Sequence, residues 1–363
     1  RRHYVAAVFK IELFHLFLQR GTSLLAASGC LGFIVPTTLL NNVYAEKLRQ
    51  WLMGRCAIKT IAISPIHVFA EADVHTSVVI LTRETNAKNR AENLIATTTD
   101  LTSEFAASPG DYASTLQSRF TALPGCVWNV LLNEANGGLI EKIRRAGQPL
   151  EAVAKINRGL ITGNRKQFFS VKKLTEKHVS ILTGADVKRY STKDPNEFVL
   201  FERPESAGGC WDKDVHLAPH KVVVRQIGTK PTASFIAKPI AVTGNIFTIR
   251  GKSEEHEKLI LGIVNSTLIE FFWGIMFSDF KSTFPQVTIF SLAQVPVSDA
   301  PTGSNGFDST QRTVIRLVDE ILAVKRTDAE ADTSAMEREI DQQVYALYGL
   351  TPEEIAIVEG TAK

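Results

Sequence analysis

The stretch CLGFIVPTTLLNNVYAEKLRQWLMGRCAIKTIAI, residues 30–63, decides the fold of the first part of the chain. It opens with a short continuous apolar run that Pro36 ends, which is typical of a central strand in a parallel sheet covered on both faces. Residues 37–54 then place apolar side chains at helical spacing and end at Gly54, which predicts an amphipathic helix with a C-terminal cap. Residues 58–63 predict a second strand. Together the three segments fit a βαβ crossover.

The flanking residues extend this pattern. Residues 11–26 predict a helix that the Ser-Gly pair at 28–29 ends, and HTSVVILT at 75–82 predicts a third strand. Only about a dozen residues separate the second and third strands, which is too few for an intervening helix, so we expect antiparallel pairing. The joining stretch IHVFAEADVHTSVVILTR, residues 66–83, holds Phe69 in an acidic, turn-like segment at the mouth of the third strand.

The rest of the chain divides by composition into three regions. Residues 85–150 are polar and rich in Ser and Thr at first and predict a connecting region. Residues 151–300 contain short strand-like runs broken by Gly, Pro and Asn, which predict a β-rich domain. Residues 301–363 predict C-terminal helices at 311–326 and 334–348, and a last helix that Thr351, Pro352 and Glu354 begin with a capping box.

Composition sets broad limits on the class of protein. The chain has 363 residues, 44% hydrophobic and 22% charged, which is ordinary for a globular protein long enough for two domains. Four scattered cysteines form no CxxC pair, so we expect no zinc site, no disulfide framework and a cytoplasmic location. The chain begins Arg-Arg-His without a signal peptide, and we interpret it as a fragment or a processed chain.

One apolar run raises the question of a membrane. LILGIVNSTLIEFFWGIMF, residues 259–277, approaches the ~20 residues that span a bilayer. It carries Asn265, Ser266, Thr267 and Glu270 near its middle, and such residues are costly in lipid. A buried helix is therefore the favoured interpretation, and we expect no membrane partner.

Catalytic motifs are absent from the sequence, and charge gives the strongest local signal. There is no P-loop, GxSxG, HExxH or GxGxxG after a strand. Residues 155–193 carry ten Lys and Arg against two Asp and Glu, interleaved with aromatic residues and glycines, whereas residues 305–363 carry twelve acidic and six basic residues. A basic segment of this kind suits a surface that follows phosphates, and the alternative is an ordinary solvated face.

Several segments follow one another in the order found in a known family. The first four segments are LAASG (25–29), GFIVP (32–36), YAEKLRQWL (44–52) and VFAEADVHTSVVIL (68–81). They are followed by RGLITGNRKQFF (158–169), LTGADVKRY (182–190), LILGIVNSTLIEFFW (259–273) and IDQQVYALYGLTPEEIAIVE (340–359). In this order the chain resembles adenine-specific DNA methyltransferases of the Taq type and type IIG restriction-modification enzymes. The likeness covers most of the chain apart from residues 85–150.

The resemblance implies a fold and an activity. Residues 1–84 would be the C-terminal part of a Rossmann-like α/β methyltransferase domain, and residues 151–300 a β-rich α+β target-recognition domain. The enzyme would move a methyl group from S-adenosyl-L-methionine to the exocyclic amino group of a flipped adenine in double-stranded DNA, within a restriction-modification or phage-defence system. It would be cytoplasmic and associated with the nucleoid.

The sequence departs from the family where the chemistry occurs. The catalytic Asn-Pro-Pro-Tyr or Asp-Pro-Pro-Tyr tetrapeptide is absent, and so is the Gly-rich turn that holds S-adenosyl-L-methionine. We therefore expect that a missing N-terminal catalytic segment binds most of the cofactor, that a nuclease could be fused or separate, and that this chain alone is inactive.

Two sets of residues are candidates for contacts to DNA. Phe69 matches the family's phenylalanine that stacks on the flipped adenine, and the plain alternative is an aromatic lid packed on the core. The candidates for phosphate or base contacts are Arg158, Asn164, Arg165, Lys166, Lys172, Lys173, Lys188 and Arg189. Two rival functions stay open: a non-catalytic specificity subunit that acts with a separate catalytic chain, and a globular protein with a vestigial half-sheet and no role with nucleic acid.

Overall fold

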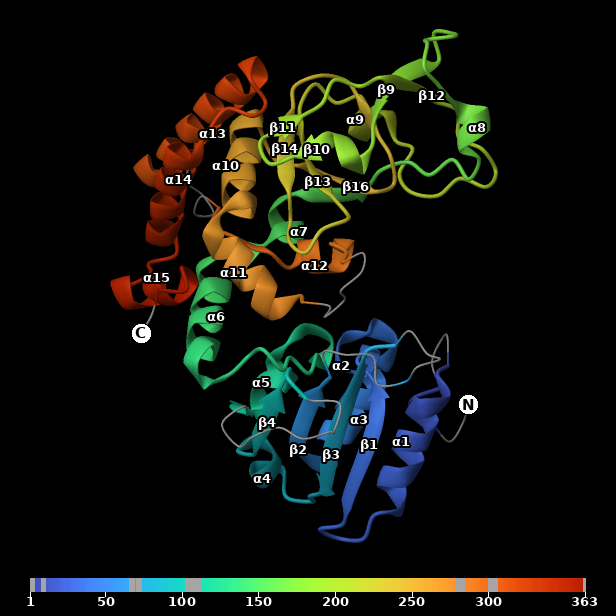
Figure 1. Cartoon of the computed structure of the whole chain (residues 1–363), viewed down its shortest axis with the longest axis vertical. Coiled ribbons are helices and arrows are strands. Elements are labelled where there is room, and N and C mark those ends of the chain that lie inside the picture. The colour runs from blue at the N-terminus through green and yellow to red at the C-terminus, as the bar shows by residue number, and fades with distance from the viewer. Residues whose placement is uncertain are drawn as a thin grey trace. The chain divides into compact units, whose positions relative to one another are not determined.

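The computed structural model describes residues 4–7, 11–64, 69, 74–101, 112–278, 285–299 and 306–361. The chain forms two compact units (Figure 1). Unit 1 comprises the chain through Gly138, and unit 2 comprises most of the chain from Leu139 onward.

A five-stranded mixed sheet forms the centre of unit 1, in the order β1-β3-β2-β4-β5. The strands are β1 (Cys30–Pro36), β2 (Cys56–Ile63), β3 (Thr76–Arg83), β4 (Leu94–Thr98) and β5 (Ala113–Leu116). The predicted antiparallel pairing of the third strand is confirmed, because β3 runs antiparallel to both β1 and β2. Since β3 lies between them, β1 and β2 point the same way without being neighbours. β4 pairs parallel with β2, and β5 antiparallel with β4.

Short helices accompany this sheet. They are α1 (Leu13–Leu24), α2 (Thr38–Asn41), the 3-10 turn η1 (Val43–Ala45), α3 (Glu46–Met53), α4 (Ala87–Ala91), α5 (Gln117–Ala122) and the 3-10 turn η3 (Pro124–Cys126). The helix predicted over 37–54 is broken at Asn42, whose side chain accepts a hydrogen bond from the backbone N–H of Tyr44 and so begins a new turn. Leu18, Leu48 and Leu52 are fully buried in the core.

β1 is an edge strand of this sheet, which corrects the prediction of a central strand. Its inner edge pairs with β3, and no strand among the described residues pairs with its outer edge. The nearby helix α1 exposes 70% of Leu13, 63% of Phe17 and 67% of Leu24. An apolar helix face and an open strand edge therefore lie on the same side of unit 1 (Figure 1).

Unit 2 is rich in short strands, as predicted. One four-stranded sheet has the order β14-β13-β16-β7, and another the order β15-β9-β12-β8. Their strands are β7 (Lys155–Arg158), β13 (Lys221–Arg225), β14 (Ala233–Ile236) and β16 (Ile246–Arg250), with β8 (Phe169–Ser170), β9 (His178–Leu182), β12 (Glu197–Leu200) and β15 (Ala241–Val242). Two small pairs complete the set: β10 (Val187–Lys188) with β11 (Ser191–Thr192), and β6 (Gln148–Pro149) with β17 (Pro296–Val297).

The helices of unit 2 confirm the predicted tail. They are α7 (Leu150–Val153), α8 (Arg165–Phe168), the 3-10 turn η4 (Gly184–Asp186), α9 (Lys213–His216), α10 (Glu254–Asn265), α11 (Thr267–Met276), α12 (Ile289–Ala293), α13 (Ser309–Thr327), α14 (Ser334–Leu347) and α15 (Pro352–Val358); α6 (Glu134–Ala146) crosses the division between the units. The capping box of Thr351 and Glu354 is present at the start of α15.

The apolar run at 259–277 forms parts of two helices, α10 and α11, that bend by 61° at Ser266. The Ser266 hydroxyl donates to the Ile263 carbonyl at 2.7 Å and accepts from the Ile269 N–H at 3.3 Å, which ends one helix and caps the next. Most of α10 and half of α11 are buried. Among the described residues no single helix is long and apolar enough to cross a membrane, although this bent pair meets the length and composition criteria together.

Candidate nucleic-acid interface

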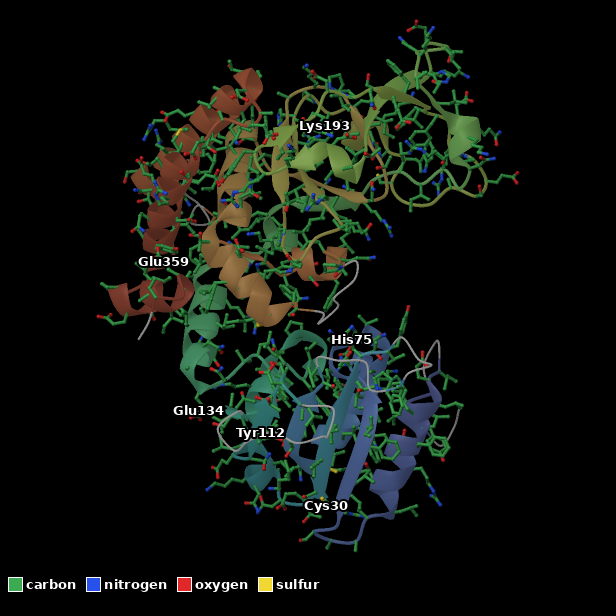
Figure 2. The ribbon with its side chains drawn as sticks, in the orientation of Figure 1. Cys30, His75, Tyr112, Glu134, Lys193 and Glu359 are labelled. Carbon is green, nitrogen blue, oxygen red and sulfur yellow. The ribbon has the colours of Figure 1, made fainter. Side chains whose placement is uncertain are left out.

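The first candidate site lies where β1 and β2 end in unit 1. The backbone N–H of Thr37 donates to the His75 carbonyl at 2.9 Å, and the N–H of Ser64 donates to the Thr76 carbonyl at 3.1 Å. The ends of β1 and β2 and the beginning of β3 therefore meet at one edge of the sheet. Figure 2 shows His75 at this edge and Cys30 at the opposite one. Ligands of α/β sheets gather at the carboxyl ends of the strands.

Phe69 belongs to the connection between β2 and β3 that starts and returns at this edge. Its side chain is 47% exposed, so one part of the ring is open to solvent. Most of the connection lies outside the described residues. A half-exposed aromatic ring in this connection is available to stack on a planar group.

A buried arginine fixes the chain that follows β1. Arg49 is fully buried and donates to four backbone carbonyls: Leu39 at 2.9 Å, Asn42 at 2.8 Å, Gly125 at 2.7 Å and Cys126 at 3.0 Å. Burial lowers the pKa of Arg49 to about 10. The cation is matched by carbonyl dipoles, because no carboxylate among the described residues lies within ion-pair distance of it. It therefore joins the turn after β1 to η3.

The second candidate site is the basic segment of unit 2, and its first part is exposed. Asn164 precedes α8, Arg165 and Lys166 lie in it, and Lys172 and Lys173 lie in the loop between β8 and β9; all five are exposed. Arg165 forms an ion pair with Glu197 and stacks its guanidinium 4.1 Å from the centre of the Phe169 ring. Lys173 pairs with Glu176 at 2.8 Å.

Lys166 and Lys172 differ from their neighbours Arg165 and Lys173, which pair with carboxylates. Within the part of the chain that the structure describes, no carboxylate lies within 4.0 Å of either ammonium group. Lys172 also lies beside the exposed Val171, and Leu174 is exposed two residues later. These two lysines are therefore the residues of the α8–β9 surface, residues 164–174, that are most available to neutralise phosphate.

The last part of the basic segment forms ion pairs with the acidic C-terminal region. Lys188 pairs with Glu330, which follows α13, and Arg189 pairs with Glu337 of α14. Arg189 also donates to the Asn265 carbonyl and lies 5.3 Å from the centre of the Tyr190 ring. The basic and acidic segments of the sequence are thus joined by ion pairs within the chain. These two predicted DNA-binding residues hold the β-rich part to the C-terminal helices.

Arg158 lies at the end of β7, and no carboxylate among the described residues lies within 4.0 Å of its guanidinium. Its Nε donates to the Gly244 carbonyl at 2.6 Å, and its Nη2 reaches the Gln226 Oε1 at 3.4 Å. Sequence analysis did not select Gln226 or its hydrogen-bond partner Gln286. No local pattern distinguishes an isolated glutamine, so only the folded arrangement reveals them.

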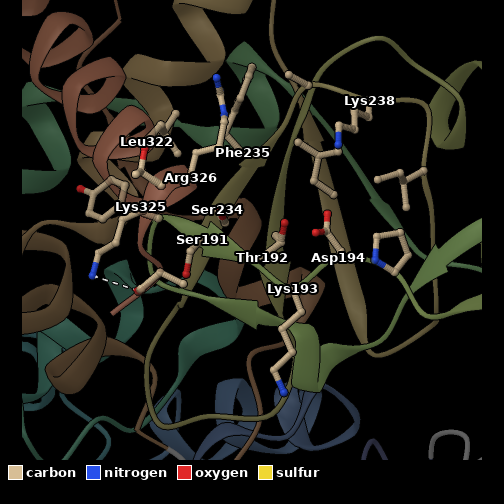
Figure 3. Close-up of a pocket in the computed structure, with 17 residues that line it drawn as sticks. Ser191, Thr192, Lys193, Asp194, Ser234, Phe235, Lys238, Leu322, Lys325 and Arg326 are labelled. Atoms are coloured by element: carbon tan, nitrogen blue, oxygen red, sulfur yellow. Dashed lines mark hydrogen bonds between the residues drawn. The ribbon is translucent and has the colours of Figure 1, made fainter. Parts of the chain in front are cut away.

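A hollow of about 690 Å³ opens in unit 2 between β11, β14 and the end of α13. Figure 3 shows Lys193, Lys238, Lys325 and Arg326 around it, with Asp194 as the acidic residue. Lys325 donates to the Ala329 carbonyl at 3.3 Å and the Ala331 carbonyl at 2.7 Å. Because Lys325 and Arg326 occupy the last turn of α13, they stabilise its negative end, and this role accounts for their position.

Buried ionic groups support the β-rich scaffold. The fully buried Glu257 accepts hydrogen bonds from Arg250 Nε at 3.0 Å and from His220 Nδ1 at 2.7 Å, and burial raises its pKa. Lys221 is also fully buried, and its ammonium donates to the His216 carbonyl at 2.8 Å. Burial lowers the pKa of Lys221 to about 8. Among the described residues no group of His, Cys, Asp and Glu could hold a metal ion.

Two known protein families match separate parts of the chain. Residues 1–69 match the Eco57I restriction-modification methylase, and residues 179–297 match the TaqI-like C-terminal specificity domain. A type II restriction enzyme and methyltransferase of Methanocaldococcus jannaschii, RM.MjaORFECS2P, is 25% identical over 93% of this chain, which spans 29% of that relative's length.

A solved structure shares the fold. The Type IIL restriction-modification enzyme MmeI, determined in complex with DNA, superposes with a TM-score of 0.60 at 8% identity. The match covers 96% of this chain and 52% of MmeI. The chain therefore spans about half of that enzyme and less than a third of the archaeal relative.

Proposed function

Because the chain resembles restriction-modification methyltransferases of the Taq type and type IIG, with a TaqI-like specificity domain after a methylase-type segment, we propose that it is the DNA-recognition portion of a site-specific DNA methyltransferase. Residues 1–84 would complete a Rossmann-like methyltransferase sheet. Unit 2 would bind double-stranded DNA and select the sequence. The observation that carries this proposal is the pair of family matches, with the methylase segment (residues 1–69) before the specificity domain (residues 179–297) in one chain.

The reaction of the whole enzyme would be methyl transfer from S-adenosyl-L-methionine to the amino group of an adenine. The residues of this chain do not fit the cofactor: β1 is followed directly by Thr37 and α2, and the sequence has no Gly-rich turn after a strand. It also lacks the Asn-Pro-Pro-Tyr tetrapeptide. We therefore assign no contact with the cofactor to this chain and expect no methyl transfer by residues 1–363 alone.

The open edge of β1 supports a further part of this proposal. Exposed apolar residues on α1 and an unpaired strand edge are costly to leave in water. A preceding catalytic segment that added strands beside β1 would cover both. A purified chain 1–363 that transferred labelled methyl groups to DNA would contradict this division of labour.

Phe69 is proposed to stack on the extruded adenine. Its exposure, in a connection between two strands whose ends meet at one edge of the sheet, supports this role, and stacking contributes ~1–3 kcal/mol per base. Phe69→Ala should weaken binding of a duplex that carries an unpaired adenine analogue by about 5- to 150-fold relative to a fully paired duplex. Phe17→Ala, which removes an exposed ring from α1, is the matched control. Equal weakening on both duplexes would remove Phe69 from this role.

The phosphate contacts are proposed to come from the α8–β9 surface. Affinity for duplex DNA should fall with salt, and each lost phosphate contact should reduce the slope of log K against log salt by ~0.9. The double variant Lys166→Ala with Lys172→Ala should therefore flatten the slope by about 2 in fluorescence anisotropy. Lys47→Ala with Lys88→Ala removes the same charge from exposed sites of unit 1. Identical slopes for both pairs would indicate an ordinary solvated face.

The alternative function is a specificity subunit whose catalytic partner is a separate chain. The methylase match over residues 1–69 favours the methyltransferase, because a pure specificity subunit needs no part of that domain. The genomic reading frame before the codon for Arg1 discriminates between the two. An in-frame Asn-Pro-Pro-Tyr with a Gly-rich strand-turn would support one enzyme, and an immediate start codon would support the separate subunit.

A further inference from the structure

Three hydrogen-bonding side chains meet in unit 2, two of them exposed (Arg158 and Gln286) and one partly buried (Gln226), although they come from distant parts of the sequence. Arg158 ends β7, Gln226 follows β13, and Gln286 precedes α12. Arg158 Nη2 lies 3.4 Å from Gln226 Oε1, and Gln226 Nε2 lies 3.4 Å from Gln286 Oε1. We call these three residues the Arg-Gln-Gln row.

The backbone beneath the row is fixed by strand-like pairing. The Gln226 N–H donates to the Asn245 carbonyl at 2.9 Å, and the Val287 N–H donates to the Gln226 carbonyl at 2.8 Å. Ile227 and Gln286 form a β-bridge. Functional side chains on such paired segments are positioned more accurately than those on free loops.

The side chains themselves are only loosely tied. Hydrogen bonds of 3.4 Å are near the limit for this interaction, so they align the three groups yet exchange easily for a better partner. The Arg158 Nη1 and the outer amide groups of both glutamines keep donors and acceptors for that partner. The row therefore presents an ordered set of donors and acceptors to the solvent.

These residue types match the edges of DNA bases. Arginine pairs with the O6 and N7 of guanine through two bonds, and glutamine pairs likewise with the N6 and N7 of adenine. The exposed side chains of Ile227 and Ile289, beside the row in sequence, could contact the methyl group of thymine. Arg158 also lies only six residues before Asn164, so one segment connects the row to the α8–β9 surface.

We propose that the Arg-Gln-Gln row reads base edges in the major groove and so determines the recognised sequence. This inference rests on the proposed DNA-binding function and names the residues that carry its specificity. Gln226 and Gln286 lie within the part of the chain that matches the specificity domain, and Arg158 precedes it. Each residue of the row selects one base pair, while the lysines of the α8–β9 surface bind any sequence.

The test is selection by the chain 1–363 from duplexes with a randomised centre, followed by sequencing of the bound fraction. The wild-type chain should enrich one motif. Gln226→Ala and Gln286→Ala should each remove the preference at one position, by about 5- to 150-fold, and leave the other positions and the salt slope unchanged. Gln286→Glu, which keeps the shape of the side chain, should shift its position towards cytosine, because a carboxylate accepts from cytosine N4.

Gln342→Ala, which removes an exposed glutamine from α14, is the matched control and should keep the wild-type motif. Variants of the row that select the unchanged wild-type motif would overturn this inference and leave the proposed function standing. A wild-type chain that retains no duplex at low salt would overturn both.

Discussion

Replacing Arg49 by methionine tests whether the turn after β1 depends on one buried cation. The guanidinium is fully buried and makes four hydrogen bonds to carbonyls of two segments, the turn after β1 and η3. Methionine fills a similar volume but donates no hydrogen bond. The carbonyls of Leu39, Gly125 and Cys126 would lose a charged donor, whereas the Asn42 carbonyl would still accept from the Ala45 N–H at 3.1 Å.

The expected loss of stability follows from two opposing contributions, the hydrogen bonds of the guanidinium and the cost of its burial. Four hydrogen bonds from a charged donor contribute about 1.5–3 kcal/mol each, or roughly 6–12 kcal/mol. Burial of the cation costs about 3 kcal/mol, because its pKa falls from the ordinary arginine value to about 10 and each pH unit corresponds to about 1.4 kcal/mol. Water that reaches the vacated carbonyls reduces the remainder further. We expect Arg49→Met to lower the free energy of unfolding of unit 1 by about 3–5 kcal/mol.

Hydrogen exchange followed by mass spectrometry across a urea series measures this loss in each unit separately. Peptides from residues 30–63 should lose protection at a urea concentration at least about 1 M lower than in the wild type. Peptides from 221–265 in unit 2 should not change. Arg55→Met, at an exposed site where the guanidinium lies over Trp51, should shift the midpoint only slightly. A shift for Arg49→Met no larger than that of the control would refute the role of the buried cation.

Three further substitutions test the scaffold of unit 2. Lys221→Met should stabilise the protein below pH 8, because burial lowers the pKa of the wild-type lysine from 10.5 to about 8. The folded wild type therefore releases this proton at a lower pH than the unfolded chain, and its free energy of unfolding should rise by up to ~3 kcal/mol between pH 8 and 10.5. The difference in stability between the two proteins, measured by chemical denaturation, should close over that pH range. A gap that stays constant with pH would contradict the lowered pKa. Gly159→Ala should prevent correct folding of unit 2, seen as lost amide protection there, because its new Cβ would lie 2.2 Å from the Thr243 carbonyl oxygen. Thr351→Ala should lower the stability of α15 by about 1 kcal/mol in the same experiment, since the cap of the Glu354 N–H is lost; no change would indicate that packing alone holds the helix.

The elements with a strong local signal were predictable from the sequence. The antiparallel third strand followed from the short link before it, and α13 to α15 followed from apolar spacing and a capping box. The sequence pattern does not indicate where a long apolar segment divides into two helices. Asn42 and Ser266 each end one helix and begin the next through a side-chain hydrogen bond, an interaction that periodicity does not register.

Strands without hydrophobic alternation were also missed. The sequence predicts a connecting region with some structure of its own over residues 85–150, and it does not indicate that β4 and β5 within that range extend the sheet of unit 1. Their buried residues include Thr97 and Thr115, and threonine in a short polar stretch gives no apolar periodicity. Its branched side chain nevertheless packs well in a sheet.

For the candidate site, the sequence indicated charge but not its partners. The sequence shows the density of positive charge over residues 155–193, but it could not show that Lys188 and Arg189 pair with Glu330 and Glu337, more than a hundred residues away. Nor could it bring Gln226 beside Gln286, since that contact depends on the pairing of distant backbone segments. Such long-range contacts are a property of the fold and have no local signature.

Hydrogen exchange of the chain 1–363 with and without duplex DNA tests the central claim most directly. If unit 2 recognises DNA as proposed, added duplex should protect peptides that cover residues 158–174, 225–228 and 285–290. Peptides from α13 to α15 should exchange as before. Protection confined to those C-terminal helices, or no protection at low salt, would contradict the assignment of unit 2 as the DNA-recognition part.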